Sequence, residues 1–421
     1  MFSLKGLVRG LLTLLAGFLL FYLGRLNWVV QHQIKIRESD RTELRSRVYG
    51  QLQFLKQALH RGAGVEMQGY YPEGFVFIQV LYGLSWCDWL AGLPSDDLRF
   101  TEGLAEIDWT LAELTSEYAR RIFPADLPLA HGVFYRGWTN YLRAQRLRLL
   151  SPAQRDSSSV AEFQYHCQAI ARALEASESP YLESYHGAVW PADNVVALAA
   201  LGQHDRLFPP RYERLRRDWL DRVQSRLDPA SGLIPHSAQP LSGHPREGAR
   251  GSSQSLMIDF LHEIDPGFGR AQFERYRTQF LEERLGLPGL REYPRGTYGA
   301  GDIDSGPVLW DIGGAASIVG MRVMARYGEG EVYRGLAAAV EGFGMGRWWG
   351  TERMYLGNGL PMADAFIAWG KVAALSAEAE LWEREWRQPW ALVGLSVGLG
   401  LVLLVGLWGL WRPYWKRKVD K

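Results

Sequence analysis

Cysteine and lysine are scarce in this chain, and neither sign of charge is in excess. The 421 residues include only Cys87 and Cys167, seven lysines, and 47 basic against 46 acidic side chains. A nucleic-acid binder needs a basic surface that neutralises phosphates, so the balanced charge argues against nucleic acid as a partner. Two cysteines without a CxxC or HxH context do not make a metal site. Because Cys87 lies in an apolar helical segment, we expect two buried thiols rather than a disulfide.

Familiar cofactor and nucleophile motifs are also missing. The chain has no Walker sequence, no GxSxG, no SxxK and no zinc motif, so no cofactor and no metal are predicted. By contrast, 47% of the residues are hydrophobic and 22% are charged, which excludes a disordered or fibrous chain. The 17 tryptophans and 19 tyrosines are unusual, and they need a place at a membrane, in a core or at a binding face.

A long uncharged run near the C-terminus predicts a membrane span. No residue from 389 to 411 carries a charge, and at about 1.5 Å per residue such a helix crosses a hydrocarbon core of roughly 30 Å. Trp390, Trp408 and Trp411 stand at its ends, where interfacial aromatics belong. The basic residues of 412–421 follow. The positive-inside rule therefore predicts a transmembrane helix over 389–411 and a basic cytoplasmic tail over 412–421.

The N-terminal apolar run is shorter, with only 15 residues from Gly10 to Gly24. That length fits a signal peptide as well as an anchor, but no small-x-small cleavage site follows. Extension past Arg25, which can snorkel, predicts an uncleaved transmembrane anchor over 7–30. With two spans the termini share a side. We therefore expect a two-pass protein of the inner (cell) membrane, with both termini cytoplasmic and residues 31–388 in the periplasm or outside.

Twelve helical segments recur between the two spans, separated by loops rich in glycine and proline. The odd-numbered segments are amphipathic and charged, as in Arg211–Val223, whereas the even-numbered ones are apolar nearly all round, as in Phe75–Leu90. A helix that is apolar on all sides is buried, and one with a single apolar stripe covers it. The segments are 38–62, 73–92, 100–121, 133–150, 158–176, 192–203, 210–227, 252–263, 268–285, 307–327, 331–345 and 362–377.

This alternation predicts an all-α domain over 31–388, an (α/α)6 toroid of six helical hairpins, each with an outer and an inner helix. A helical solenoid is disfavoured because no fixed repeat period is present, and a membrane bundle because the odd segments are charged. Consecutive inner helices of a toroid run parallel, so the six loops that enter them share one face with six helix N-termini. We call this face the rim, and we expect function there. Its loops are 69–74, 129–138, 184–194, 235–253, 292–307 and 354–364.

Three rim loops carry candidate functional residues. Loop 292–307 (EYPRGTYGAGDIDSGP) holds Asp302 and Asp304, which also fit an Asx-turn and a helix N-cap. Loop 184–194 (SYHGAVWPADN) ends on Asp193, which is either an N-cap or a catalytic carboxylate. Loop 235–253 holds Arg250 at a helix N-terminus, where the helix dipole disfavours a cation, so an anionic group such as Glu247 or a rim aspartate should lie nearby.

The predicted architecture resembles the six-hairpin (α/α)6-toroid enzyme superfamily. Several glycosidases of that superfamily place a carboxylate in a Trp-Pro-x-Asp loop that enters an inner helix, and residues 190–193 (WPAD) are similar. The resemblance implies a glycosidase-like enzyme with Asp193 as a catalytic carboxylate. The chain is more distantly similar to the linalool dehydratase-isomerase family of periplasmic hydro-lyases. That family pairs two active-site cysteines with Asp, Tyr and His, whereas Cys87 and Cys167 both lie off the predicted rim.

We therefore predict a membrane-anchored glycoside hydrolase-like enzyme that acts on an envelope or extracellular glycan by inversion. Its acid and base come from Asp193, Asp302 and Asp304, since inverting enzymes hold two carboxyl groups about 6.5–9.5 Å apart. Crowding of the two loop aspartates would raise the pKa of one of them, which suits an acid. Residues predicted to stack on sugar faces or to bind hydroxyls or a uronate are Tyr135, Tyr185, His186, Trp190, His236, Arg250, Glu292 and Tyr293.

Two other functions remain open at this point. A hydro-lyase or isomerase that acts on a lipid-like alcohol would be favoured by an apolar, closed cavity. A non-catalytic glycan-binding or envelope-assembly protein would show aromatic residues at the rim but no pair of carboxylates facing each other across a pocket. In all three cases we expect the lipid bilayer as a partner through both terminal helices, together with a carbohydrate or another small molecule.

Overall fold

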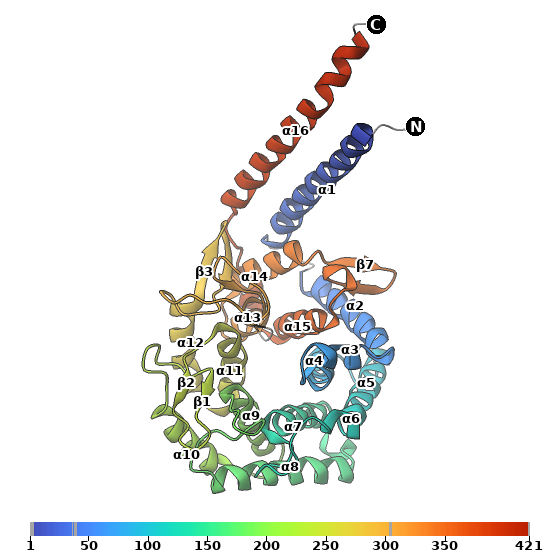
Figure 1. The fold of residues 1–421 in the computed structure, drawn as a ribbon. Helices are drawn as coiled ribbons and strands as arrows, with labels where there is room; N and C mark the ends of the chain where they lie inside the picture. The colour runs from blue at the N-terminus through green and yellow to red at the C-terminus, as the bar shows by residue number, and fades with distance from the viewer. Residues whose placement is uncertain (1–3, 36, 38–39, 303–304, 420–421) are drawn as a thin grey trace.

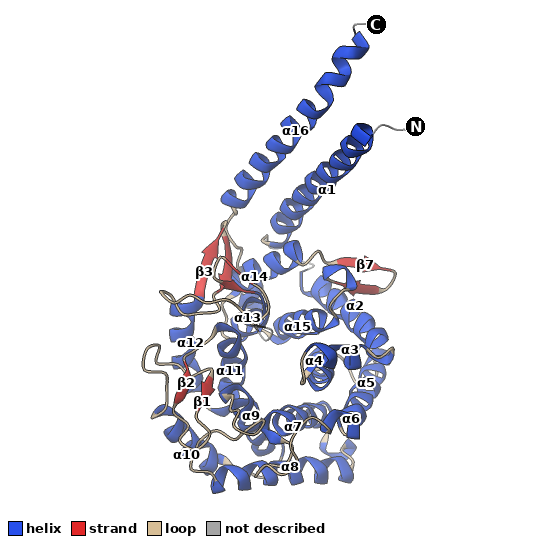
Figure 2. Ribbon diagram, viewed as in Figure 1, coloured by secondary structure: helices blue, strands red, loops and turns tan. Residues whose placement is uncertain are grey.

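Helices make up most of the chain, which a computed structural model describes over residues 4–35, 37, 40–302 and 305–419. In Figure 1 the helices between the two long terminal ones are arranged as a ring, and Figure 2 shows the strands as short hairpins around it. Each of the twelve segments predicted from the sequence contains a helix in the structure. The predicted helical class of the fold is confirmed.

Six of these helices form an inner layer. Each packs against the next inner helix along the chain and the last packs against the first, so the contacts close on themselves. Their apolar composition follows from this position, because residues 191–204 of one of them are all buried. The inner helices are α4 (Gly74–Leu90), α7 (Gly132–Leu149), α9 (Pro191–Leu207), α11 (Gly251–Ile264), α13 (Gly314–Arg326) and α15 (Pro361–Val372).

Six further helices form an outer layer, and each packs on one inner helix. They have a single apolar stripe: between Glu213 and Gln224, for example, the buried residues are Trp219, Leu220 and Val223. The pairs are α2 (Asp40–His60) on α15, α5 (Leu98–Leu114) on α4, α8 (Ser157–Ala176) on α7, α10 (Glu213–Gln224) on α9, α12 (Pro266–Phe280) on α11 and α14 (Gly330–Phe343) on α13.

Several short elements complete the domain, and the sequence did not predict them as separate helices. Two are short α-helices that follow α2 and α5, and the others are single 3-10 turns beside longer helices. They are α3 (Ala63–Tyr70), α6 (Glu117–Arg120), η1 (Pro152–Gln154), η2 (Leu356–Asn358), η3 (Ala373–Ser376) and η4 (Ala379–Glu383).

Backbone hydrogen bonds join the entry points of neighbouring inner helices. Val133 N–H, at the start of α7, donates to Glu183 O in the loop before α9, at 3.0 Å. Gly251 N–H, the first residue of α11, donates to Glu292 O in the segment before α13, at 2.8 Å. These contacts place the starts of α7 and α11 beside the loops that enter α9 and α13, as expected at the rim.

Four antiparallel hairpins lie in the segments that enter α11, α13 and α15. One of them replaces the first two turns of the helix predicted over 307–327, because Trp310 and Asp311 have φ values of 50° and 71°. Two consecutive residues in the left-handed region form a hairpin turn and cannot continue a helix. The hairpins are β1 (Ser237–Ala238) with β2 (Pro245–Glu247), β3 (Leu281–Arg284) with β4 (Leu287–Leu290), β5 (Val308–Leu309) with β6 (Ile312–Gly313), and β7 (Arg347–Trp349) with β8 (Glu352–Met354).

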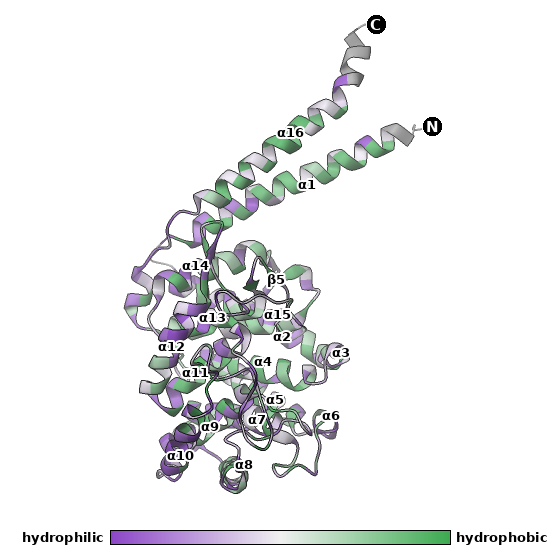
Figure 3. Ribbon diagram, turned by 60° about the vertical axis from the view of Figure 1, so that its left-hand side comes forward, coloured by the Kyte–Doolittle hydropathy of each residue, from purple (hydrophilic) through white to green (hydrophobic). Residues whose placement is uncertain are grey.

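Two long apolar helices leave the ring side by side. Helix α1 (Leu4–Gln33) and helix α16 (Trp390–Val419) pack against each other, and each is long and apolar enough to cross a membrane, over Gly6–Gln33 and Trp390–Arg412. In Figure 3, which colours the ribbon by hydropathy, hydrophobic residues recur along both helices, and in Figure 1 the far ends of both helices point away from the ring. Both predicted spans are thus present as helices, and α16 continues into the segment predicted as a tail.

The base of α1 belongs to the ring rather than to an exposed span. Leu26, Val30 and Ile34 are buried, and the first two lie over Gly342 of α14. Arg25 donates from Nη2 to the carbonyl of Gly346 at 2.7 Å. Apart from Trp28, the large apolar side chains that remain exposed on α1 lie before Arg25, and they include Leu7, Leu11, Leu14, Leu15, Phe18 and Phe21.

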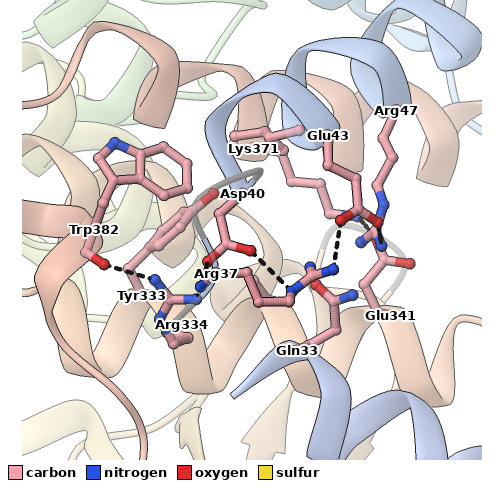
Figure 4. A pocket seen from close by; sticks show the side chains of 12 residues that line it. Gln33, Arg37, Asp40, Glu43, Arg47, Tyr333, Arg334, Glu341, Lys371 and Trp382 are labelled. Atoms are coloured by element: carbon pink, nitrogen blue, oxygen red, sulfur yellow. Dashed lines mark hydrogen bonds and ion pairs between the residues drawn. The ribbon is translucent and has the colours of Figure 1, made fainter. Parts of the chain in front are cut away.

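A small cavity lies where α1, α2 and α14 meet. Figure 4 shows its lining, in which Arg37 pairs with Asp40 and Glu43, and Arg334 donates to Asp40 and to the carbonyl of Trp382. The volume is about 40 Å³, which is room for a few water molecules and not for a saccharide. We assign this cluster to the attachment of α1 to the ring.

The cysteines behave as the sequence predicts. Cys87 in α4 and Cys167 in α8 are both free and buried. Burial raises the pKa of both thiols, that of Cys167 to about 12, so neither is a ready nucleophile.

Candidate functional site

Arg250 is the centre of a charged cluster at the rim. It immediately precedes α11, and its guanidinium donates from Nε to Glu292 Oε1 at 2.9 Å and from Nη1 to Asp302 Oδ2 at 2.5 Å. Glu247 Oε1 lies 3.6 Å from the same Nη1. The anionic partners that the sequence predicted for this cation are therefore present. They offset the unfavourable interaction of a cation with a helix N-terminus.

One donor of this buried guanidinium is left over. The Arg250 side chain is only 4% exposed, and its Nη2 has no hydrogen-bond partner among the described residues. A buried donor without a partner costs about 1–3 kcal/mol. A ligand oxygen that reached Nη2 would recover that free energy.

Glu292 holds the inner side of the cluster. It is fully buried, and besides Arg250 it accepts from the backbone N–H of Ser252 at 3.1 Å and from the Ser252 hydroxyl at 2.8 Å. Burial raises the pKa of Glu292 above its usual value, although Ser252 and Arg250 oppose that shift. With both carboxylate oxygens bound by the protein, Glu292 positions Arg250 and is closed to a ligand.

Asp302 lies on the outer side and is 48% exposed. Arg250 holds the pKa of the Asp302 carboxyl well below its usual range, and hydrogen bonds from Ser305 act in the same direction. The raised pKa that crowding was predicted to give one of the two loop aspartates is therefore not that of Asp302, whose nearest charge is a cation. Asp304, the other predicted carboxylate of this loop, lies outside the described residues.

His236 lies behind the cluster as a neutral side chain. It is 8% exposed, its Nδ1 hydrogen-bonds the Ser253 hydroxyl at 2.5 Å, and its Nε2 is 3.8 Å from Glu247 Oε2. Burial, and then the charge of Arg250, lower the pKa of His236 to about 4. At neutral pH this imidazole can exchange hydrogen bonds with a ligand but carries no charge.

Aromatic rings border the charged cluster. Tyr293 lies under the Arg250 guanidinium, 5.5 Å from its centre, and its hydroxyl donates to the carbonyl of Ala300 at 2.8 Å. Tyr298 is 73% exposed in the same loop. An Arg–Tyr stack beside an exposed ring is suited to the mixed polar and apolar faces of a sugar.

Asp193 belongs to a second group on the neighbouring rim loop. It lies in the first turn of α9, 8% exposed, and accepts from the Ser184 hydroxyl at 2.6 Å. Trp190 precedes the helix, half-buried, with its ring centre 6.3 Å from that of Tyr185. The two loops are joined where Ala238 N–H donates to Val189 O at 3.2 Å. Asp193 is thus on the rim face, as predicted, but in a group of its own.

Two predicted substrate-binding residues lie elsewhere. Tyr135 is 3% exposed and donates from its hydroxyl to the carbonyl of Leu114, so its ring fills the space between α7 and α5 and is closed to a sugar. His186 is exposed at the tip of its loop, 3.1 Å from Asp126 Oδ1 on a neighbouring loop. Of the residues predicted from the sequence, the structure therefore gathers His236, Arg250, Glu292, Tyr293 and Asp302 around one point.

Sequence reasoning missed the supporting residues Ser252 and Ser253 as parts of the cluster. Their signal was present, because small hydroxyl residues at a helix N-terminus are common partners of carboxylates and histidines. Asp364, a buried carboxyl in the first turn of α15, was not among the predicted site residues either. Burial raises the pKa of Asp364 to about 8, and its Oδ2 has no partner among the described residues.

A larger cavity opens on the opposite face of the ring. It measures about 860 Å³ and lies among the C-terminal ends of α4, α7, α11 and α13. Its lining is charged and its edge is formed by exposed residues of segment 376–380, whereas a lipid-like alcohol would need an apolar, closed cavity. This cavity is therefore not the apolar, closed one that a lipid-like alcohol would need. Charged residues of this lining include Asp88, Arg148, Glu263, Arg270, Arg322 and Arg326.

Metal chemistry has no support in the described residues. No group of three or more His, Cys, Asp or Glu side chains in that part of the chain is arranged to hold a metal ion. The rim cluster instead offers one cation between carboxylates, a neutral imidazole, two serine hydroxyls and exposed aromatic rings. This combination can bind hydroxyl or carboxylate oxygens and present a hydrated carboxylate, that of Asp302, beside them.

Comparison with known proteins gives no relative. No protein-family model matches the chain, and none of the curated protein sequences matches it.

Proposed function

We propose that the protein is a membrane-anchored, glycoside hydrolase-like protein whose rim binds an acidic saccharide. The observation that supports this most is Arg250. Its buried guanidinium is fixed by Glu292 and Asp302, stacks on Tyr293 and keeps Nη2 without a partner among the described residues. A uronate carboxylate is the ligand group that a guanidinium binds best, and a sugar ring suits the bordering aromatics.

The architecture in this proposal is an (α/α)6 toroid with two membrane spans. The closed sequence of contacts among the six inner helices, and the pairing of each with one outer helix, support six hairpins. The two apolar helices lie side by side and support a two-pass topology with the termini on one side. The basic residues of 412–421 support a cytoplasmic location for that side, with the ring in the periplasm or outside.

Hydrolysis is the reaction that the proposal assigns to the bound glycan. Asp302 is held ionised by Arg250 and cannot donate a proton, so its role is to accept a proton from the attacking water. The proposal takes the proton that the leaving glycosidic oxygen needs from Asp193, which lies two rim loops away, beyond loop 235–253. The water oxygen bonds to the anomeric carbon as the glycosidic bond breaks, which inverts the configuration.

Binding of polysaccharides to the full chain in lipid nanodiscs tests the proposal. We expect a polyuronate to bind more tightly than a neutral glucan. The substitution Arg250→Lys should weaken polyuronate binding about tenfold or more, because a single ammonium cannot hold both carboxylates and reach the ligand as well. The matched control is Arg295→Lys, an exposed arginine in the same rim segment. Equal affinities for the parent and Arg250→Lys proteins would refute the assignment.

The release of reducing ends separates catalysis from binding alone. If the parent protein hydrolyses the glycan, Asp193→Asn and Asp302→Asn should each abolish most of the activity, whereas Asp126→Asn, a change at an exposed surface carboxylate, should not. Full activity in both of the first two proteins would refute the assigned roles. If the parent protein bound the glycan but released no reducing ends, it would be a glycan-binding protein and not a hydrolase.

A further inference from the structure

Two rim hairpins carry large apolar side chains exposed to solvent, and both lie close to the terminal helices. In and beside hairpin β7–β8 the exposed residues are Phe343, Met345, Trp348 and Trp349, the last of which is 74% exposed. At the turn of hairpin β5–β6 they are Leu309, at 71%, and Trp310, at 67%. Soluble surfaces rarely gather such residues without a partner.

Hairpin β7–β8 is attached to α1 at one position along the helix, Arg25. Arg25 donates to the carbonyl of Gly346, the residue directly before β7. The candidate span of α1 begins at Gly6, and all of its exposed large apolar side chains except Trp28 lie before this arginine. The helix from Gly6 to Arg25 is about 30 Å long, which matches the thickness of a hydrocarbon core, and Trp28 follows where interfacial tryptophans lie. Arg25 therefore marks the depth at which a bilayer around α1 would end. Figure 1 shows β7 at the level of the base of α1.

The second hairpin is fixed beside the start of α16. Arg284 donates to the carbonyl of Trp310 at 3.2 Å, and the next residue, Leu285, accepts from Leu392 N–H in the first turn of α16 at 3.1 Å. Trp390, at the start of the same apolar helix, is 73% exposed. In Figure 3, β5 lies at the end of the ring that carries the two terminal helices.

We propose that the hairpins β7–β8 and β5–β6 lie in the headgroup region of the bilayer and form a membrane-contact surface on either side of the two spans. The surface continues the lipid-facing side of α1, and its tryptophans are the side chains that prefer the membrane interface. Exposed Arg347 can pair with anionic headgroups. Because both hairpins belong to rim segments, the ring stands edge-on with part of its rim at the membrane surface. This inference rests on the proposal that α1 and α16 cross the membrane.

Site-directed spin labelling of the full chain in liposomes tests this surface. Both native cysteines are buried, so an added cysteine can be labelled selectively. One label goes to the hairpin turn at Thr351→Cys, one to the middle of the span at Leu14→Cys, and a control label to Leu241→Cys, an 86%-exposed site in the loop between β1 and β2. Collisions with a water-soluble nickel complex and with oxygen measure the surroundings of each label.

The label at Thr351 should collide with the nickel complex several-fold less often than the label at Leu241. Trp349→Ser, which removes an exposed ring, should raise its collision rate. If the label at Thr351 collided with the nickel complex as often as the label at Leu241, while the label at Leu14 rarely did, the membrane-contact surface would be overturned. The two proposed spans would not be affected by that result. Frequent collisions of the label at Leu14 with the nickel complex would overturn both the membrane-contact surface and the membrane spans. If the label at Thr351 were shielded from the nickel complex only at high protein-to-lipid ratios, a second copy of the chain would be what covers the hairpin. That result would also overturn the membrane-contact surface.

Discussion

The Asp259→Asn protein is expected to unfold with a free energy about 3–5 kcal/mol lower than that of the parent protein. Asp259 is fully buried in α11 and accepts from Arg322 Nε at 2.6 Å and from Arg326 Nε at 2.5 Å. Burial disfavours its charge, but the two guanidiniums outweigh burial and lower the pKa of Asp259 to about 2. Loss of the anion leaves buried Arg322 with Asp88 and partly buried Arg326 with Glu263, at 3.7 Å, and the two cations then repel each other without the carboxylate that they share.

Denaturant unfolding of the full chain in detergent, followed by circular dichroism, measures this effect. The matched control is Asp218→Asn, a 60%-exposed carboxylate paired with an exposed arginine, which should change stability by less than about 0.5 kcal/mol. The double variant Asp259→Asn/Arg326→Met should recover part of the loss, because it also removes one of the two cations. An Asp259→Asn protein as stable as the control would contradict the assigned network.

The Asp364→Asn protein is expected to be more stable than the parent protein at neutral pH. Asp364 is fully buried, its Oδ1 accepts from Tyr355 N–H at 2.9 Å, and burial raises its pKa to about 8 from an ordinary value of 3.8. The stability that its protonated form contributes is complete below pH 4 and is lost as the pH rises toward 8. Asparagine resembles the protonated carboxyl and cannot ionise, so the variant does not undergo this loss.

The control for this variant is the same comparison near pH 4, where the side chain of Asp364 is protonated in the folded parent protein. Near pH 4 the parent and variant proteins should unfold at similar denaturant concentrations. Their difference should then grow by about 1.4 kcal/mol for each pH unit up to the folded-state pKa. A difference that does not change between pH 4 and pH 8 would show that Asp364 stays ionised in the folded chain, paired with a group that compensates its charge.

The alternation of charged and apolar segments was enough to predict the helices. Residues 75–90 and 194–201 are apolar on all sides and form inner helices, and 211–223, with one apolar stripe, covers the second of them in the outer layer. The short strands could not be predicted this way. Two or three residues give no periodicity, and the turn at Trp310 and Asp311 lacks the glycine or asparagine that usually marks one.

The candidate site was predicted in its chemistry but not in all of its members. Arg250 was expected to have an anionic partner because the dipole at a helix N-terminus repels a cation. Its partners in the structure are Glu292 and Asp302. Tyr135 was expected on the rim because it lies near a loop, but the helix that begins at Gly132 turns its ring inward. Sequence proximity to a loop does not fix the direction of a side chain.

The buried ion pairs could not be predicted from the sequence either. Arg322 and Arg326 stand four residues apart in an apolar helix, which is a sign that an anion must face them. Their partner, Asp259, is 63 residues from Arg322 in the chain. Only the packing of α11 against α13 brings the three together.

The central claim is that ligands bind at the rim rather than in the cavity on the opposite face. Hydrogen–deuterium exchange of the full chain in nanodiscs, with and without a polyuronate, tests it most directly. We expect slower exchange in peptides that cover 235–253 and 291–302 when the saccharide is bound. Slower exchange confined to 87–95 and 373–381, which border the opposite cavity, would contradict the account.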